Sequence, residues 1–443
     1  MRNDFHGNSV TGASATAIER YSEALQQFAC YSDDPLATLT SAVEDSPEFA
    51  MAHLAKAQMT LAGTDKSAIT LAEEVLETVS GLKLNDRERA HTEVVRAIKE
   101  GRYAEGHELL ERIVIQHPRD LLAVQVAHLW DFLRGDARRL RERIGMALPH
   151  WSESDRDYHA LLGMHAFGLE ESGHYPQAEE RGRQAVAMNY RDSWAQHAVA
   201  HVLEMQGRID EGILWMRSNE KGWAPNNFFA VHNWWHLALY HLDKGEIDGV
   251  LALYDGPIRE ARSTLMLDMV DASAPLWRLY LRGVDVSGRW APLADDWSPF
   301  AEDGRYAFND VHAIMAFVGA GRERDVNRTI ATMERQAEGS ATYAAMNREV
   351  GLPVARALQA FSRGDYAQTV VLLRPIRSIA NRFGGSHAQR DILDLTLIEA
   401  AIRGGDQATA AAFTGERSHR KPTSPLAWLL DRRAKEIGRR EAA

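Results

Sequence analysis

Ten glycines recur along the chain at nearly constant intervals, and they constrain the fold more than any other feature. Each is followed by a short polar turn and a new amphipathic segment, and neighbouring members are 34 to 43 residues apart. The ladder consists of Gly63, Gly101, Gly135, Gly173, Gly207, Gly245, Gly283, Gly321, Gly364 and Gly404. Glycine readily adopts the left-handed conformation that ends one helix and lets the next fold back. A regular ladder of this kind therefore predicts stacked helical hairpins.

The segments between the glycines have the periodicity of helices. Apolar residues recur at i, i+3, i+4 and i+7, and strand alternation bounded by hairpin turns is hard to find. The clearest units are GRYAEGHELLERIVIQHPRD, SGHYPQAEERGRQAVAMNYRDSWA and RGDYAQTVVLLRPI. These units resemble tetratricopeptide repeats, whose usual period is about 34 residues. We predict an all-α fold, an α-solenoid of irregular tetratricopeptide-like helical hairpins forming a superhelix.

Composition excludes several functional classes. The 443 residues include 51 basic and 62 acidic side chains, a net charge of −11. An acidic chain argues against nonspecific binding to nucleic acid or to anionic membranes, because both depend on clustered positive charge. The single cysteine, Cys30, excludes an internal disulfide framework and a cysteine-rich zinc module.

The sequence also predicts how the chain is organised. Residues 1–16 are rich in Gly, Ser, Thr and Asn and are expected to form a mobile tail, followed by a single solenoid over 17–430 and a charged end over 431–443. Residues 287–310 contain two prolines and an acidic run. They are expected to form a long loop between helices, either a surface excursion or a lid. The N-terminus lacks a signal-peptide pattern and no apolar stretch reaches membrane-span length, so a cytoplasmic location is predicted.

Polar residues recur at matching positions in the helices that precede the ladder glycines. His236 and His312 each lie nine residues before a glycine, and Asp271 lies twelve before Gly283. Matching offsets place such residues on one helix face, so we expect a polar stripe that lines a concave cavity. The predicted ligand-binding residues of this cavity are His197, His201, His232, Asn233, Trp234, Asn309, His387, Asp391 and Arg390.

Two His-x-x-x-His pairs suggest metal chemistry. This spacing lets both imidazoles of a pair reach one divalent ion, so the candidate metal ligands are His197, His201, His232 and His236. We expect Asp268, Asp271, His312 and Asp391 to complete a mononuclear or dinuclear site in which bound water is acidified. The chain lacks the His-Glu-x-x-His motif, and no Glu is expected beside either pair. Both observations argue against a zinc hydrolase of the usual kind.

The same residues also support chemistry without a metal. A buried His beside an Asp can act as a general base near neutral pH. The candidate catalytic pairs are His236 with Asp271 and His312 with Asp268. The opposing interpretation is that these histidines are structural and bond to one another, to Asp268 and Asp271, or to backbone.

Aromatic residues favour a pocket over an open groove. Eight of the 11 tryptophans lie between Trp194 and Trp297, the stretch that contains both histidine pairs. Large rings with a few convergent polar groups are typical of small-molecule sites.

Several long strings in this region point to one family. They are HAVAHVLEMQGR, HNWWHLALYHLDKGEID, LDMVDASAPLWRL, FNDVHAIMA and GGSHAQRDIL. On these strings the chain resembles the tetratricopeptide repeat protein 38 family over nearly its whole length. The resemblance implies an all-helical repeat fold and a cytosolic protein, and it implies no particular activity.

Three hypotheses about function follow. The first, which the sequence favours, is a helical-repeat protein that binds a small molecule or short peptide in a His/Asp/Trp-rich cavity and carries out acid–base catalysis there. The second is a protein-interaction scaffold with a protein partner or a second copy of the chain. The third is a metal-dependent hydrolase or lyase that uses the histidine pairs. Whether the chain is an enzyme, and whether a divalent metal is its cofactor, stays open at this point.

Overall fold

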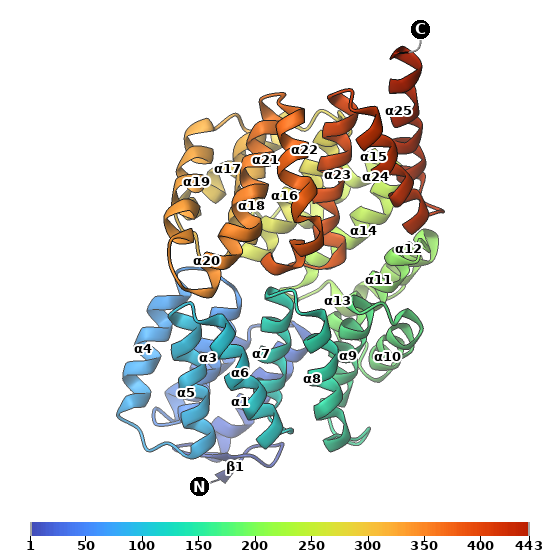
Figure 1. Ribbon diagram of the computed structural model, residues 1–443. Helices are drawn as coiled ribbons and strands as arrows, with labels where there is room; N and C mark the ends of the chain where they lie inside the picture. Colours follow the sequence, from blue (N-terminus) through green and yellow to red (C-terminus); the bar gives the residue numbers. More distant parts are fainter. Residues whose placement is uncertain (1, 442–443) are drawn as a thin grey trace. The chain divides into compact units, whose positions relative to one another are not determined.

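The computed structural model describes residues 2–441, which are helical almost throughout (Figure 1). Contacts between residues divide the chain into two compact units. The N-terminal unit comprises Met1–Val202 and Asn219–Ala230, and the C-terminal unit comprises Leu203–Ser218 and Val231–Ala443. Two of the three boundaries fall inside helices, α11 (Ser193–Met205) and α14 (Ala230–Lys244), and the third follows Ser218.

The N-terminal unit begins with the short strands β1 (Arg2–Asn3) and β2 (Ser9–Val10), which pair antiparallel with Arg2 opposite Val10. Its helices are α1 (Ala15–Cys30), α2 (Pro35–Asp45), α3 (Ala50–Ala62), α4 (Ala68–Ser80), α5 (Asp86–Lys99), α6 (Tyr103–Gln116), α7 (Leu121–Leu133), α8 (Ala137–Ala147), η1 (Leu148–His150), α9 (Tyr158–Glu171), α10 (Tyr175–Met188) and α13 (Glu220–Trp223).

The C-terminal unit contains the remaining helices. They are α12 (Ile209–Ser218), α15 (Ile247–Leu253), η2 (Tyr254–Ile258), α16 (Met266–Leu281), α17 (Ser287–Trp297), η3 (Ser298–Phe300), α18 (Ala307–Gly319), α19 (Glu323–Ala337), α20 (Thr342–Met346), η4 (Asn347–Gly351), α21 (Leu352–Ser362), α22 (Tyr366–Leu373), η5 (Arg374–Phe383), α23 (His387–Arg403), α24 (Gln407–Arg420) and α25 (Pro425–Glu441).

The glycine ladder marks the turns between paired helices, as predicted. Eight of its ten members have positive φ, from 65° at Gly135 to 83° at Gly245. At the other two turns the left-handed residue comes one position later, at Thr64 (φ 60°) and Gly405 (φ 73°). Such a residue lets the last carbonyls of one helix be satisfied while the chain reverses direction. The all-α helical-hairpin fold is thereby confirmed.

The helix that precedes each ladder glycine forms the core. In α16 nearly every residue is buried, including the polar Asp268, Asp271, Ser273 and Arg278. The helices that follow the glycines are more amphipathic, and α19 buries only one face. Because buried polar groups need partners, the polar residues of the core helices locate the candidate site.

The beginning of the chain differs from the expected mobile tail. Residues 2–10 form the β1–β2 pair, and Thr11 donates a backbone hydrogen bond of 2.8 Å to Glu88. Glu88 also completes a capping box with Asn85 at the start of α5, which fixes the carboxylate that the tail contacts. These contacts between distant residues have no short-range sequence signal.

The predicted loop over 287–310 is also wrong for most of its length. Residues 287–297 form α17 and 298–300 a 3-10 turn, so only 301–306 connect to α18. Trp290, Leu293, Ala294 and Trp297 are buried at i, i+3, i+4 and i+7, and this apolar stripe outweighs the cost of Pro292 inside the helix.

At the C-terminal end α25 continues through the charged residues to Glu441, and 442–443 lie outside the described part. A single solenoid over 17–430 stays a prediction. Among the residues described, none of the helices is both long and apolar enough to cross a membrane.

Candidate functional site

Each predicted histidine pair occupies one face of a buried helix. His197 and His201 lie on α11 with ring centroids 4.4 Å apart, and His232 and His236 lie on α14 with centroids 4.9 Å apart. All four side chains are at most 3% exposed. We call these four residues the histidine cluster.

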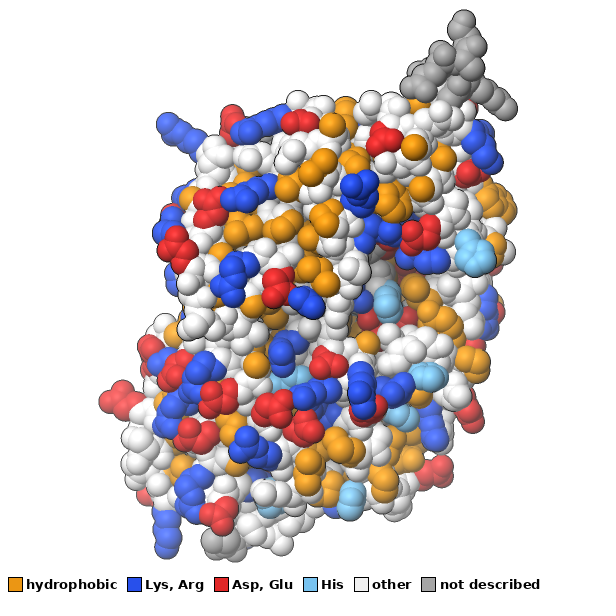
Figure 2. Space-filling model, in the orientation of Figure 1, with side chains coloured by type: hydrophobic (Ala, Val, Ile, Leu, Met, Phe, Trp, Pro, Cys, Tyr) orange, Lys and Arg blue, Asp and Glu red, His pale blue; other side chains and the backbone are white. Residues whose placement is uncertain are grey.

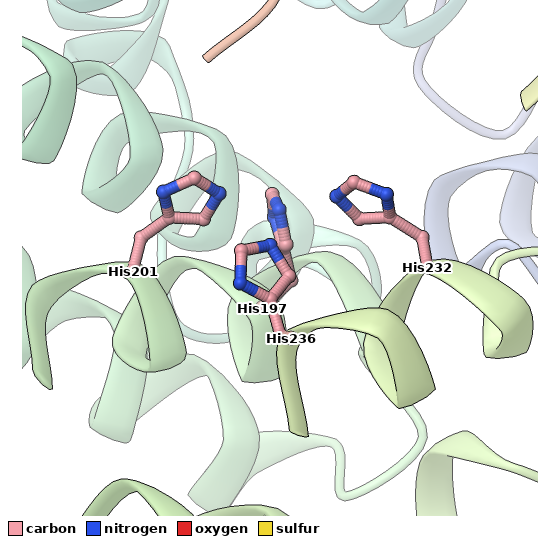
Figure 3. Close-up of side chains that lie close together, drawn as sticks. All are labelled: His197, His201, His232 and His236. Carbon is pink, nitrogen blue, oxygen red and sulfur yellow. The ribbon is translucent and has the colours of Figure 1, made fainter. Parts of the chain in front are cut away.

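The two pairs come together. Each of the four imidazoles presents one ring nitrogen such that all four atoms lie within 4.8 Å of one another (Figure 3). Pairs four residues apart on a helix share a face, so both rings of each pair reach the same side. The spacing accounts for the common side within each pair, whereas helix packing decides which pair faces which.

Carboxylates lie beside the Nδ1 atoms of three of these rings. His232 Nδ1 donates to both oxygens of Asp271 at 2.9 Å. His236 Nδ1 lies 3.4 Å from Glu204, and His201 Nδ1 lies 3.7 Å from Glu170. A carboxylate beside Nδ1 favours the tautomer with the proton on that atom, which leaves the Nε2 lone pair available to a ligand.

Glu204 and Glu170 were not predicted from the sequence as neighbours of the histidines, nor was Glu171 beside Glu170. Glu204 follows His201 by three residues and His197 by seven, so it shares their helix face, and the statement that no Glu accompanies either pair is wrong. Glu170 and Glu171, on α9, form a second buried group with His201 in which the ligand atoms lie within 4.8 Å of one another. No local motif connects α9 to α11.

Both predicted catalytic dyads differ from the contacts found. Asp271 contacts His232 instead of His236, and burial raises the Asp271 pKa while the His232 contact opposes that rise. His312 Nδ1 donates to the Phe308 carbonyl at 2.8 Å instead of to Asp268. Burial lowers the His312 pKa to about 4 and raises the Asp268 pKa to about 6.

The remaining predicted residues are either buried on α14 or half-buried near the starts of α18 and α23. Asn233 and Trp234 are buried on α14, and the Arg217 guanidinium lies 5.3 Å from the Trp234 ring centre. Asn309 and His387 are half-buried near the starts of α18 and α23. Arg390 Nη2 lies 3.4 Å from His387 Nδ1.

Asp391 has a structural partner. Its two carboxylate oxygens accept from the Arg417 guanidinium at 2.6 and 2.9 Å. Burial opposes ionisation of Asp391, but the Arg417 charge outweighs it and holds the Asp391 pKa well below its usual range. Such bidentate pairs are strong, so Asp391 is committed to Arg417 and the expectation that it completes a metal site is wrong.

Arg278 is a buried cation on the same helix as Asp271, seven residues further along. Its guanidinium donates to the Ala274 carbonyl at 3.2 Å and to the Ala388 carbonyl at 2.8 Å, and lies 5.5 Å from the Trp235 ring centre. Burial lowers the Arg278 pKa to about 10. The same charge acts, after burial, to lower the pKa of both His236 and His312.

A surface cleft of about 420 Å³ lies elsewhere, in the N-terminal unit. Its lining comprises Glu111, Asp136, Arg138, Arg139, Glu142, Arg143 and Met146. None of these is a predicted site residue, and the walls are mostly charged, unlike the apolar walls of most small-molecule pockets. Acidic and basic side chains are likewise interspersed on the face shown in Figure 2.

Comparison with known proteins gives no family assignment. No protein-family model matches the chain. The crystal structure of yeast Tom70 is 11% identical and has a TM-score of 0.38, with 96% of this chain and 88% of that chain covered. Naa15/Naa10 bound to HypK-THB gives 12% identity and a TM-score of 0.27, with 96% and 67% covered. Likeness at this level has no bearing on function.

Proposed function

We propose that this helical-repeat protein binds one divalent transition-metal ion at the histidine cluster. The observation that carries the proposal is the convergence of four buried imidazole nitrogens within 4.8 Å of one another. Neutral imidazole is a preferred ligand of zinc and of neighbouring transition metals. Four histidines gathered in one buried place supply a complete set of such ligands.

The spacing suits a metal ion after small side-chain movements. Ligand nitrogens at about 2.1 Å from a zinc ion in tetrahedral geometry are about 3.4 Å from one another. The largest separation in the cluster, at most 4.8 Å, exceeds this by little more than 1 Å. Rotations of the imidazoles about their side-chain bonds cover such a difference.

The carboxylates support the same interpretation. Histidines that bind metals commonly donate their second ring nitrogen to a carboxylate, which orients the ring and makes the ligating nitrogen more basic. His232 makes this contact with Asp271, and His236 and His201 have Glu204 and Glu170 at the equivalent atom. One ring therefore has the carboxylate hydrogen bond typical of a metal ligand, and two more have a carboxylate within 3.7 Å of the same atom.

The kind of ion decides what the site does next. Four imidazoles saturate a four-coordinate zinc ion, which then has a structural role. A six-coordinate ion held by the same four ligands keeps two positions for water or substrate. Such an ion acidifies bound water and polarises substrate oxygens, the chemistry of a hydrolase or lyase.

Metal analysis of the protein without a histidine tag tests the proposal. The protein is stripped with a chelator and titrated with Zn²⁺, Mn²⁺, Co²⁺ and Ni²⁺, while metal content and melting temperature are measured. We expect one equivalent of at least one ion and a rise in melting temperature. The variants His201→Ala and His236→Ala should lose both.

The matched control is His419→Ala, because His419 is an exposed histidine on α24 that does not belong to the cluster. It should bind the ion as the wild type does. If all three variants bind metal equally, or none of the ions binds the wild-type protein, the proposal fails.

A second candidate function is binding of a small molecule or short peptide with acid–base catalysis and no metal. The observation that favours it is the buried His232–Asp271 contact at 2.9 Å, with Asp268 one turn away on α16. A thermal-shift screen of metal-stripped protein against metabolites tests this candidate. A ligand that stabilises the wild type and not Asp271→Asn supports it, whereas a screen without any stabilising ligand argues against it.

The protein-interaction scaffold remains the third proposal, because arrays of helical hairpins often bind other proteins, although fold is a weak guide to function. A stoichiometric partner found by pull-down from cell extract, or a stable homodimer, supports it. Membership of the tetratricopeptide repeat protein 38 family and a cytoplasmic location are proposals of the same standing, and both rest on the sequence strings.

A further inference from the structure

Arg278 is a buried charge without a carboxylate of its own. Its side chain is 3% exposed and forms no ion pair with any described side chain. Two of the five guanidinium N–H groups donate to backbone carbonyls, those of Ala274 and Ala388. Removing a charge from water costs several kcal/mol, so buried charges in proteins are usually paired.

The carboxylates nearest to Arg278 already have other partners. Asp271 accepts from His232 at 2.9 Å, and Asp391 accepts from Arg417 at 2.6 Å. Glu204 lies 3.5 Å from Lys421 and 3.4 Å from His236. None of these carboxylates forms an ion pair with Arg278 directly, although the charges of Asp391, Glu204 and Asp271 favour its protonated form.

The position of Arg278 connects it to the histidine cluster. Its guanidinium lies over Trp235, and the Trp235 ring lies 5.1 Å from His232 and 4.8 Å from His236 by centroid. Asp271 and Arg278 are seven residues apart on α16, so they share a helix face. That face contacts His232 at one end and Trp235 at the other.

We infer that Arg278 binds the anionic group, a carboxylate or a phosphate, of a small molecule held beside the histidine cluster. Arginine presents parallel N–H donors that fit such oxyanions in a bidentate way. The guanidinium lies 5.5 Å from the Trp235 ring centre, and three of its five N–H groups have no acceptor among the described residues. The inference rests on the proposed function for its location, and it specifies the charge of the substrate.

Anion titrations of wild-type and variant protein test the inference. Inorganic phosphate and succinate are added to metal-stripped and to zinc-loaded protein at constant ionic strength, with chloride as the balancing anion. Binding is followed by calorimetry and by melting temperature. We expect saturable binding of one of the two anions, and the arm that responds identifies the oxyanion. Arg278→Met should weaken anion binding at least tenfold. Arg278→Lys should bind the anion with an affinity between those of the wild type and Arg278→Met.

Arg282→Lys is the control. Arg282 follows the last residue of α16, four residues after Arg278, and its side chain donates to the Leu242 carbonyl at 2.6 Å. It should leave anion binding unchanged. The inference is overturned if neither anion binds the wild type, or if Arg278→Met binds as the wild type does. A purely structural Arg278 predicts a variant that is less stable by the same amount with and without anion.

The two proposals can fail separately. Anion binding that is lost in Arg278→Met, with no metal binding at all, leaves the anion site standing and removes the metal. Metal binding without any anion effect does the reverse.

Discussion

Asp310, in the C-terminal unit, offers a quantitative test of how burial of a carboxyl group changes stability with pH. It lies in the first turn of α18, where Oδ1 accepts from the Gly304 backbone N–H at 3.3 Å and Oδ2 has no hydrogen-bond partner among the described residues. Burial, with a smaller contribution from Asp303, raises the Asp310 pKa to about 8. At neutral pH the folded protein therefore holds this carboxyl protonated.

The size of the effect follows from linkage between protonation and folding. An Asp in the unfolded chain has a pKa of about 3.9, and each pH unit above it at which the folded carboxyl stays protonated costs about 1.4 kcal/mol of stability. Because the folded pKa is raised, the favourable contribution is complete below the unfolded pKa and is lost as the pH rises through the folded value. At pH 7, which is about 3 pH units above the unfolded pKa, the loss of unfolding free energy is at most roughly 4 kcal/mol.

Replacing Asp310 by Asn keeps the oxygen that accepts from Gly304 and removes the ionisation. We expect Asp310→Asn to match the wild type near pH 4 and to be more stable by about 2 to 4 kcal/mol at pH 7. For a unit of this size that corresponds to a rise in melting temperature of roughly 5 to 15 °C. Thermal melts between pH 4 and pH 8 measure it.

The control is Asp248→Asn, which changes an exposed carboxylate in α15. It should shift the melting temperature little at any pH. A difference between Asp310→Asn and the wild type that stays constant from pH 4 to pH 8, or a variant that is less stable at pH 8, would refute the reasoning.

Two further predictions concern the turns and the buried ion pair. Gly283 has φ 76° with open space around it, so Gly283→Ala should lower the free energy of unfolding by about 1 to 2 kcal/mol, measured in urea. Gly288→Ala, inside α17 and equally uncrowded, should instead stabilise by up to about 1 kcal/mol, and equal effects of the two would contradict the left-handed turn. Asp391→Asn should cost about 1 to 3 kcal/mol at pH 7 because it removes the anion that pairs with the buried Arg417 guanidinium. The folded Asp391 pKa is depressed, so the pair contributes stability above the unfolded pKa and loses it as the pH falls. If Asp391→Asn is as much less stable than the wild type in acid as at pH 7, this argument is contradicted.

The fold was predictable because its turns have a local chemical cause. A left-handed residue at each helix end favours glycine, so the ladder marks the turns without knowledge of long-range contacts. The two failures have different causes, one local and one long-range. Pro292 and the acidic residues after it suggested a loop, whereas the buried Trp290 and Trp297 hold that segment in a helix. The N-terminal residues are ordered by Glu88, which is distant in sequence.

The site was predictable in part for the same reason. The spacing of His197 and His201 sets their common helix face, and so does that of His232 and His236. The partner of His232 was not predictable, because Asp271 lies 39 residues away and helix packing decides which histidine it meets. Glu204 was readable from its spacing to the α11 pair.

The most direct test of the metal proposal is X-ray absorption at the zinc edge on stripped protein reloaded with one equivalent of Zn²⁺. The cluster predicts a shell of nitrogen scatterers at about 2.0 to 2.1 Å with the outer-shell pattern of several imidazoles. The nitrogen count should drop in His236→Ala. A shell made of oxygen atoms, or a spectrum unchanged in His236→Ala, would show that the ion binds elsewhere and would contradict the proposed function.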